Sequence, residues 1–163
     1  MNSSPDWLPP KIEFSGEWHV FINVLYSVFE RNLKKSPKPM LGEYVVFHDN
    51  RKLESDREEG FWHITTQKDA STGERLPDLQ RSRRLTWIRP IIEHCDSPLV
   101  RCFDYADGKG RVRSYLWLFD HDFVVVLQKQ DRGHTKIARL ITAYYIDGER
   151  GRHQLEKRYR ERL

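Results

Sequence analysis

The stretch that decides the fold is VRSYLWLFDHDFVVVLQK, residues 112–129. Two runs rich in aromatic and β-branched residues, 112–119 and 123–129, flank the short polar segment 120–122, a pattern typical of two antiparallel strands joined by a tight turn. Residues 99–105 and 136–146 have a similar composition, and a DGKG hairpin turn is expected at 107–110. The sequence therefore predicts a four-stranded antiparallel meander over residues 99–147.

Alternation along these strands divides the side chains between two faces. In the first strand of the quoted stretch, Leu116 and Leu118 share a face typical of a core, whereas Tyr115 and Trp117 share the other face with Arg113. In the last strand, alternation groups Leu140, Thr142, Tyr144 and Ile146. Because aromatic rings and arginines mix on this second face, we expect it to be partly covered or to bind a ligand, and ordinary cross-strand aromatic packing is the alternative.

Helices are expected on the N-terminal side of the meander. Residues 15–35 carry apolar side chains every three or four positions. Residues 79–89 predict a second helix, with Asp78 as its N-cap and Pro90 as the start of a kink or a new short helix. The expected fold class is α+β, with N-terminal helices packed on one face of a four-stranded or slightly larger antiparallel sheet.

Two short segments between these helices predict further strands. They read EYVVFH at 43–48 and FWHITT at 61–66, and residues 67–77 between the second strand and the second helix are expected to form a loop. Both segments combine aromatic with β-branched residues, the composition that favours a pleated, half-buried surface.

The length of 163 residues predicts a single domain over 1–163. We expect a loosely ordered lead-in at 1–13, a helical part with short strands at 14–95, the sheet at 99–147, and a basic helix or tail at 149–163. No apolar run reaches the ~20 residues of a membrane helix, and the N-terminus lacks the layout of a signal peptide. With only two cysteines, the sequence predicts a cytoplasmic protein with no membrane partner.

The net charge of +4 is unevenly distributed. Residues 43–60 carry a net charge of −3, whereas residues 81–89 carry +4 and residues 149–163 carry +3. Two compact basic segments suggest a footprint for phosphates, and a solvated helix face with a soluble tail is the alternative interpretation.

Several reaction classes leave no signature in this sequence. It contains no GxxxxGK[ST], GxGxxG or GxSxG motif, so ATP-driven phosphoryl transfer, dinucleotide binding and α/β-hydrolase chemistry are disfavoured. His94, Cys95 and Cys102 could offer three ligands, but no zinc-type spacing accompanies them. We therefore expect no metal site and no cofactor.

The remaining residue types suit metal-free cleavage of RNA by its own 2′-hydroxyl. That reaction needs a base for the hydroxyl proton, an acid for the leaving oxygen, and cations that stabilise charge on the transition state. His63 is the first candidate for acid or base, because imidazole titrates near neutrality. A hydrogen-bonded structural histidine is the alternative reading of this residue.

Four motifs in this order resemble the barnase–EndoU–colicin–RelE-like nuclease superfamily, in its phage- and plasmid-associated branch. They are FWHITT at 61–66, RSRRLTWIRPII at 81–92, YLWLFDHDFVVVLQK at 115–129 and LITAYYID at 140–147. The resemblance spans roughly residues 44–147. It implies a helical N-terminal part on a four-stranded antiparallel sheet, and a metal-independent endoribonuclease that leaves a 2′,3′-cyclic phosphate.

The resemblance also implies roles for individual residues. His63 matches the family histidine, the family's basic helix residue falls on Arg84 or Arg81 with Arg84 preferred, and the Thr-Ala-Tyr of the last strand falls on Thr142 to Tyr144. The expected catalytic set is thus His63, Arg84, Thr142 and Tyr144. The expected substrate-binding set is Arg81, Arg89, Tyr115, Lys129 and Arg139. A second family histidine is missing, and Tyr115, Lys129, Arg139 or His134 are the candidates for its role.

The expected function is therefore an endoribonuclease acting on tRNA or mRNA, as a toxin or an effector in phage conflict. A cognate antitoxin or immunity protein is an expected partner. The alternatives are a non-catalytic module of the same fold that binds RNA or protein, and an interaction protein whose basic tail docks on an acidic partner.

Overall fold

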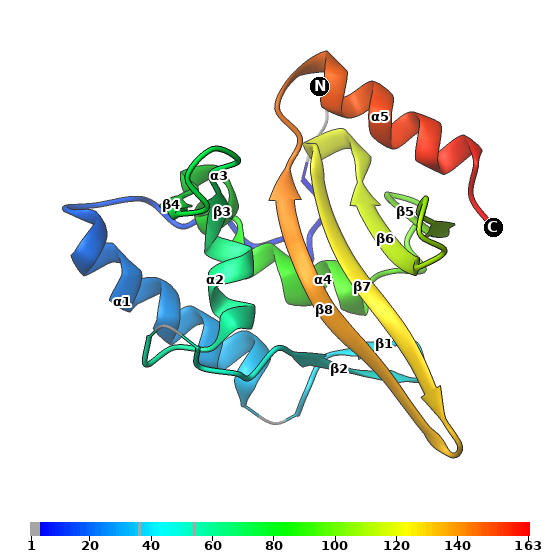
Figure 1. Cartoon of the computed structure of the whole chain (residues 1–163), viewed down its shortest axis with the longest axis horizontal. Helices are drawn as coiled ribbons and strands as arrows, with labels where there is room; N and C mark the ends of the chain where they lie inside the picture. Colours follow the sequence, from blue (N-terminus) through cyan, green and yellow to red (C-terminus); the bar gives the residue numbers. More distant parts are fainter. Residues whose placement is uncertain (1–3, 36, 54) are drawn as a thin grey trace.

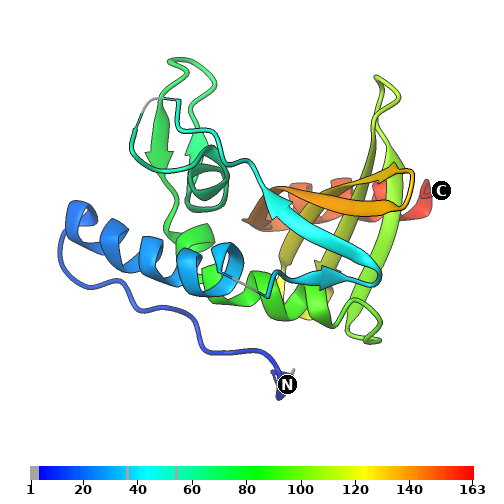
Figure 2. The same cartoon turned by 90° about the horizontal axis from the view of Figure 1, so that it is seen from below.

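The computed structural model describes residues 4–163 except Ser36 and Glu54. Its centre is a curled mixed sheet with strand order β1-β2-β8-β7-β6-β5 (Figures 1 and 2). The predicted meander is confirmed as the antiparallel strands β5 (Val100–Ala106), β6 (Val112–Leu118), β7 (Phe123–Arg132) and β8 (Thr135–Tyr145). The α+β class is confirmed as well.

The sheet is larger and less regular than a four-stranded antiparallel one. Strand β2 (Tyr44–His48), expected from the sequence, pairs parallel with β8, and β1 (Met40–Leu41) pairs antiparallel with β2. Parallel neighbours need a long crossover, which the sequence pattern of isolated strands does not reveal. Here the crossover from β2 to β8 spans residues 49–134, which include the other three strands of the meander.

The helices follow the predicted order with different boundaries. The first predicted helix is α1 (Trp18–Phe29), which continues as a π-helical turn, η1 (Glu30–Lys34). The second is divided into α3 (Leu79–Arg83), a 3-10 turn η2 (Leu85–Trp87) and α4 (Ile88–Glu93). Pro90 lies in the first turn of α4, where its missing N–H has no intrahelical partner to lose. As predicted, the Asp78 side chain caps α3, accepting from the Arg81 amide at 3.1 Å.

The segment around His63 is helical, so the predicted strand at 61–66 is wrong. It forms α2 (Glu59–Thr65), whose Phe61, Ile64 and Thr65 are buried with helical spacing. The buried Thr65 hydroxyl donates to the Phe61 carbonyl at 2.9 Å. This bond to the residue four positions earlier forms within a helix and would not form in an extended strand. Tertiary burial of this face outweighs the strand propensity of the residues.

A two-stranded hairpin follows α2, where a loop was expected. Strand β3 (Thr66–Lys68) pairs antiparallel with β4 (Arg75–Pro77), so that Lys68 and Arg75 lie opposite each other. The turn between them is held by the Asp69 carboxylate, which accepts from the Ser71 amide at 2.8 Å.

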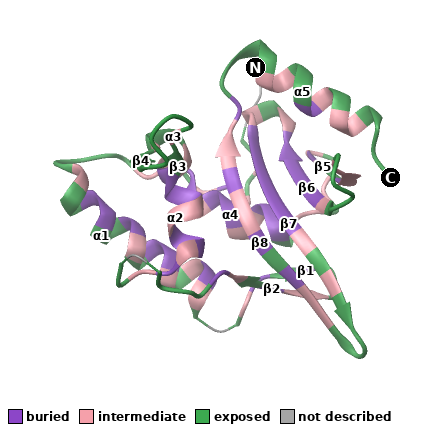
Figure 3. Ribbon diagram, viewed as in Figure 1, coloured by how far each residue is buried: buried purple, intermediate pink, exposed green. Residues whose placement is uncertain are grey.

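Both faces of the sheet carry a packed cluster, so helices do not cover one face alone. Leu116 and Leu118 belong to the larger cluster, with residues of α1, α2 and α4. Tyr115 and Trp117 belong to a smaller cluster on the opposite face, which α5 (Gly148–Arg160) covers through Leu155. Figure 3 shows α5 as a mostly exposed helix. The prediction that the aromatic face is partly covered is confirmed, and the basic tail is the helix that covers it.

A β-bulge corrects the predicted alternation on β8. Thr142 pairs with Val126 and Leu140 pairs with Leu127, which leaves Ile141 as the extra residue. Leu140 therefore packs in the larger cluster, whereas Tyr144 and Ile146 lie at the smaller one on the opposite face. Alternation alone had placed Leu140 with Tyr144 and Ile146, because one inserted residue reverses every side chain beyond it.

The described part of the lead-in, residues 4–13, is docked rather than loosely ordered. Leu8 is buried, and Trp7 stacks on His94 with ring centroids 4.5 Å apart. The Ile12 amide donates to the Arg83 carbonyl at 2.7 Å, and Trp87 Nε1 donates to the Pro9 carbonyl at 2.8 Å. Residues 1–3 of the lead-in and Glu54 of the acidic segment lie outside the described residues.

Candidate functional site

The candidate site lies where α2 replaces β2 along the edge of β8. The last register pair of β2 and β8 is His48 with Leu140, and beyond it α2 packs against β8. There the Thr142 hydroxyl donates to the main-chain carbonyl of His63 at 2.9 Å. This bond fixes the helix that carries His63 against the strand just after the bulge.

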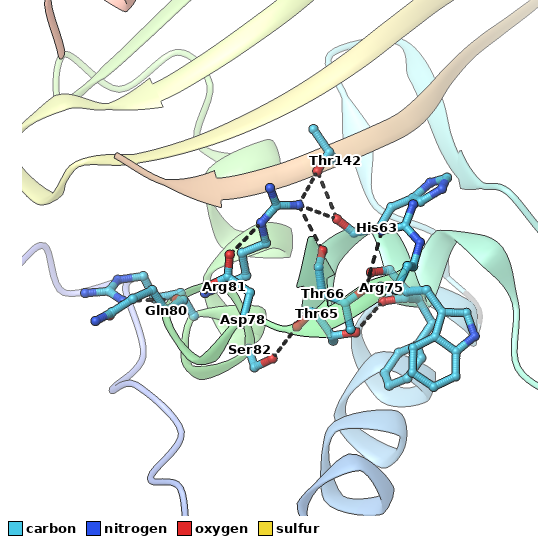
Figure 4. A network of polar contacts seen from close by, with 12 residues as sticks. His63, Thr65, Thr66, Arg75, Asp78, Gln80, Arg81, Ser82 and Thr142 are labelled. Atoms are coloured by element: carbon cyan, nitrogen blue, oxygen red, sulfur yellow. Dashed lines mark hydrogen bonds and ion pairs between the residues drawn. The ribbon is translucent and has the colours of Figure 1, made fainter. Parts of the chain in front are cut away.

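Arg81 of α3 ties three elements together at this point (Figure 4). Its Nη1 donates to the His63 carbonyl at 2.9 Å, to the Thr142 hydroxyl at 3.1 Å and to the Thr66 carbonyl at 3.2 Å. Its Nε donates to Asp78 Oδ2 at 3.1 Å. Among the described residues Nη2 makes no hydrogen bond, so one edge of the guanidinium stays available to a ligand.

Two adjoining pockets open beside this network. One, of about 290 Å³, is lined by His63, Gln67, Lys68, Arg75, Arg81, Ile141 and Thr142. The other, of about 630 Å³, shares His63, Lys68 and Arg75 and adds Trp62 and Glu59. The shared side chains place the His63 imidazole with two cations, Lys68 and Arg75, at the surface of the protein.

The environment of His63 favours a neutral imidazole. Burial is the main cause that holds its pKa below the ordinary 6.5, and the nearby Arg75 acts in the same direction, while Glu59 opposes them. A neutral imidazole can accept a proton at pH 7. Arg75 donates to the Thr66 hydroxyl at 3.4 Å, and Lys68 makes no ion pair with any described residue, so both keep charge free for an anion.

Of the sequence-predicted residues, His63, Thr142 and Arg81 are brought together here. Tyr144 is their half-buried neighbour, since the Arg81 guanidinium carbon lies 6.0 Å from its ring centroid. Burial is the main cause that raises the pKa of Tyr144 above 10. Arg139 is exposed on β8, and its charge contributes to the lowering of the His63 pKa.

Arg84 lies in a different environment from the one predicted. It is buried, its guanidinium carbon is 4.1 Å from the Tyr145 ring centroid and 5.2 Å from that of Trp87, and Nη1 donates to Gln80 Oε1 at 2.7 Å. It lines neither His63 pocket. Of Arg81 and Arg84, it is Arg81 that lines the pocket, because α3 ends at Arg83 and the chain turns Arg84 toward the larger core cluster.

The other predicted substrate-binding residues are also engaged elsewhere. Arg89 donates to the Asn32 carbonyl at 2.9 Å and so ties α4 to η1. Tyr115 is buried beneath α5, with its hydroxyl 3.3 Å from Arg158 Nη1. The Lys129 ammonium lies 3.7 Å from an Asp104 carboxylate oxygen. None of the three lines a His63 pocket.

Sequence reasoning missed Lys68, Arg75 and Glu59. The first two lie in the segment interpreted as a loop, and Glu59 was counted only in an acidic run. A usable signal was present, because Lys68 and Arg75 flank the turn-forming DASTG at 69–73, which favours a hairpin with the two cations side by side.

Three observations complete the description. Among residues 4–35, 37–53 and 55–163, no group of three or more His, Cys, Asp or Glu side chains is arranged to hold a metal ion. Within the same residues, no helix is both long and apolar enough to cross a membrane. Comparisons with protein-family models, with curated proteins and with solved structures each gave no match.

Proposed function

We propose that the chain is a metal-independent endoribonuclease that cleaves RNA through the substrate's own 2′-hydroxyl. The observation that carries the proposal is the meeting of a half-buried histidine of lowered pKa, His63, with Lys68, Arg75 and Arg81 at adjoining pockets. A phosphodiester is the anion that this set suits, and an imidazole beside it suits proton transfer.

The proposed reaction uses the side chains in separate roles. Neutral His63 takes the proton of the 2′-hydroxyl, whose oxygen then forms a bond to phosphorus. Arg75 and the free edge of Arg81 stabilise the charge on the phosphorane-like transition state. As the bond to the 5′-oxygen breaks, that oxygen takes a proton from the Lys68 ammonium or from water. The products are a 2′,3′-cyclic phosphate and a 5′-hydroxyl.

Thr142 takes a positioning role in this proposal. Its hydroxyl bonds to the main chain of His63 rather than to the imidazole, so it orients α2 and Arg81 together. Arg81 and Arg75 stabilise the transition-state charge in this proposal, which is the role predicted from the sequence for Arg84. tRNA or mRNA as the substrate, and an antitoxin or immunity protein as the partner, belong to the same proposal.

The decisive experiment sequences RNA ends after incubation with purified protein in EDTA. Wild type should yield cyclic-phosphate ends, and His63→Ala should yield none above background while it keeps the wild-type melting temperature. His19→Ala is the matched control, since His19 is exposed on α1 and lines neither His63 pocket. Intact RNA with wild type, or equal cleavage by wild type and His63→Ala, would overturn the proposal.

A non-catalytic RNA-binding module is the second candidate. It is favoured by one observation: most of the polar capacity of Arg81 is used on protein carbonyls and on Asp78. Such a module would shift RNA without shortening it, with an affinity that falls as salt rises. The same comparison of wild type with His63→Ala separates the two candidates, because neither protein would cleave RNA if the chain only binds it.

A further inference from the structure

A third pocket lies further along β8 and has no part in the proposed chemistry. Its volume is about 410 Å³, and it is lined by Phe47, His48, Asp49, Asn50, Arg51, Gln130, Ile137 and Arg139. Phe47 and Arg139 are paired in the parallel register of β2 and β8, and both are exposed. The neighbouring residues Val46, Ala138 and Leu140 belong to the larger core cluster, so Phe47 and Arg139 lie on the opposite, outer face of the sheet.

This pocket and the His63 site share one strand face. Ile137 and Arg139 line the third pocket, and Ile141 and Thr142 line the smaller His63 pocket. Arg139 and Thr142 are three residues apart, which is about 10 Å along a strand. Arg139 makes no ion pair with any described residue, and its charge contributes to lowering the pKa of both Asp49 and His63. The charge of Arg139, unpaired among the described residues, therefore lies between the third pocket and the His63 site.

The side chains of the third pocket suit a nucleobase. Phe47 is 41% exposed, and the Lys38 ammonium lies 5.7 Å from the centroid of its ring. Exposed aromatic rings on a sheet offer a surface on which an unpaired base can stack. The side-chain amides of Asn50 and Gln130 make no hydrogen bond with other described residues, and each offers both a donor and an acceptor to a base edge.

We propose that the Phe47 pocket binds a nucleobase of single-stranded RNA, stacked on Phe47 and hydrogen-bonded by Asn50 or Gln130, while the strand passes Arg139 toward His63. The inference rests on the proposed function, because the RNA strand is what connects the two places. Arg139 would hold the backbone phosphate between the bound base and the scissile bond, as arginine does in other phosphate contacts.

The test measures binding of a fluorescein-labelled 2′-O-methyl RNA octamer by anisotropy. This probe has no free 2′-hydroxyl, so binding is read without cleavage. Phe47→Ala should weaken binding by roughly five- to a hundredfold, the range expected for one lost base–aromatic stack. Phe47→Tyr should bind as wild type does. Phe14→Ala is the matched control, since Phe14 is also 41% exposed but lies outside this pocket.

Cleavage by the same variants separates this inference from the proposed function. Phe47→Ala should raise KM for single-stranded RNA and leave kcat close to wild type, because Phe47 lines neither His63 pocket. If wild type binds the octamer through Phe47 but cleaves no RNA, the base pocket stands and the nuclease fails. If wild type cleaves RNA but Phe47→Ala matches Phe14→Ala in affinity and KM, the nuclease stands and the pocket fails. An octamer that wild type does not bind, or binds through Arg139 alone, would also overturn the base pocket.

Discussion

Thr142 and His63 are joined by a hydrogen bond from the threonine hydroxyl to the histidine's main-chain carbonyl, at 2.9 Å. The bond spans 79 positions of sequence and links the last strand of the meander to a short helix of the N-terminal part. Arg81 donates to both partners, so three elements meet through one carbonyl and one hydroxyl. The position of the His63 side chain therefore depends on two residues whose hydrogen bonds go to its main-chain carbonyl.

Replacing Thr142 with valine should lower cleavage much more than it lowers the stability of the fold. The change keeps the branched shape but removes the donor to His63 and the acceptor of Arg81, so unfolding free energy should fall by about 1 kcal/mol. Cleavage should fall tenfold or more, because α2 loses its fixed place against β8. Thr135→Val, at the exposed start of the same strand, is the control for both chemical denaturation and cleavage assays. Equal cleavage by the two variants would contradict the positioning role.

The pH dependence of cleavage should follow the charge beside His63. Arg75 helps to hold the pKa of His63 below 6.5, so Arg75→Gln should raise that pKa. A base must be unprotonated, and the acid limb of the cleavage profile should therefore move to higher pH. The pKa itself can be followed by NMR titration of the His63 ring. Arg132→Gln, at an exposed position near the hairpin end, should leave both readouts unchanged.

Stability should depend on pH in a related way. The folded-state pKa values of His48 and His63 both lie below the ordinary 6.5, mainly because the rings are buried. The unfolded chain therefore takes up these protons first as the pH falls. The contribution of both rings is complete above pH 6.5 and is lost as pH falls through their folded pKa values. Melting temperatures measured across this range should decline toward acid, and less so in His48→Gln.

Arg84, which sequence reasoning placed in the catalytic set, should matter for stability, whereas Arg75, which it missed, should matter for cleavage. Arg84→Ala removes buried contacts to Tyr145 and Trp87, so unfolding free energy should fall by about 2–3 kcal/mol. Its kcat per folded molecule should stay near wild type. Arg75→Ala removes an exposed cation, so stability should change little while kcat falls about a hundredfold. A large kcat loss in Arg84→Ala at full folding would return that residue to the site.

Gly60 should tolerate no side chain. A Cβ added there would lie 2.8 Å from His48 Cβ and 3.0 Å from the main chain of Asp49, because α2 begins directly against the end of β2. Gly60→Ala should therefore destabilise the protein by about 1–3 kcal/mol, although alanine favours helices. Gly108→Ala meets nothing within 4 Å and should change stability little. Thermal melts of the two variants give the comparison, and equal melting temperatures would show that α2 can move away from β2.

The meander was predictable because its signals are local. Each strand between Val100 and Tyr145 is a run of aromatic and β-branched residues, and the turns between them carry Asp, Gly and His. The bulge at Ile141 was not predictable, since it changes the pairing by one residue without altering the composition. The parallel pairing of β2 was hidden for a similar reason, because a partner 92 positions away, as for Val45 and Ile137, leaves no local pattern.

The candidate site was predictable only in part. His63 and Thr142 were singled out from sequence motifs, and the structure places them side by side. The choice between Arg81 and Arg84 depended on the last turn of a five-residue helix, whose phase no sequence pattern defines. Lys68 and Arg75 depended on the β3–β4 hairpin, and hairpin registers are set by turn geometry.

The sequence by itself determined the α+β class, the order of the meander strands and the presence of two differently composed sheet faces. Those features follow from residue periodicity, which acts over neighbouring positions. Only the tertiary structure decided that FWHITT is helical, that α5 covers the aromatic face, and that Arg81 rather than Arg84 meets His63. Each of these depends on which surfaces are buried against each other, and burial between distant segments outweighs the propensity of any single one.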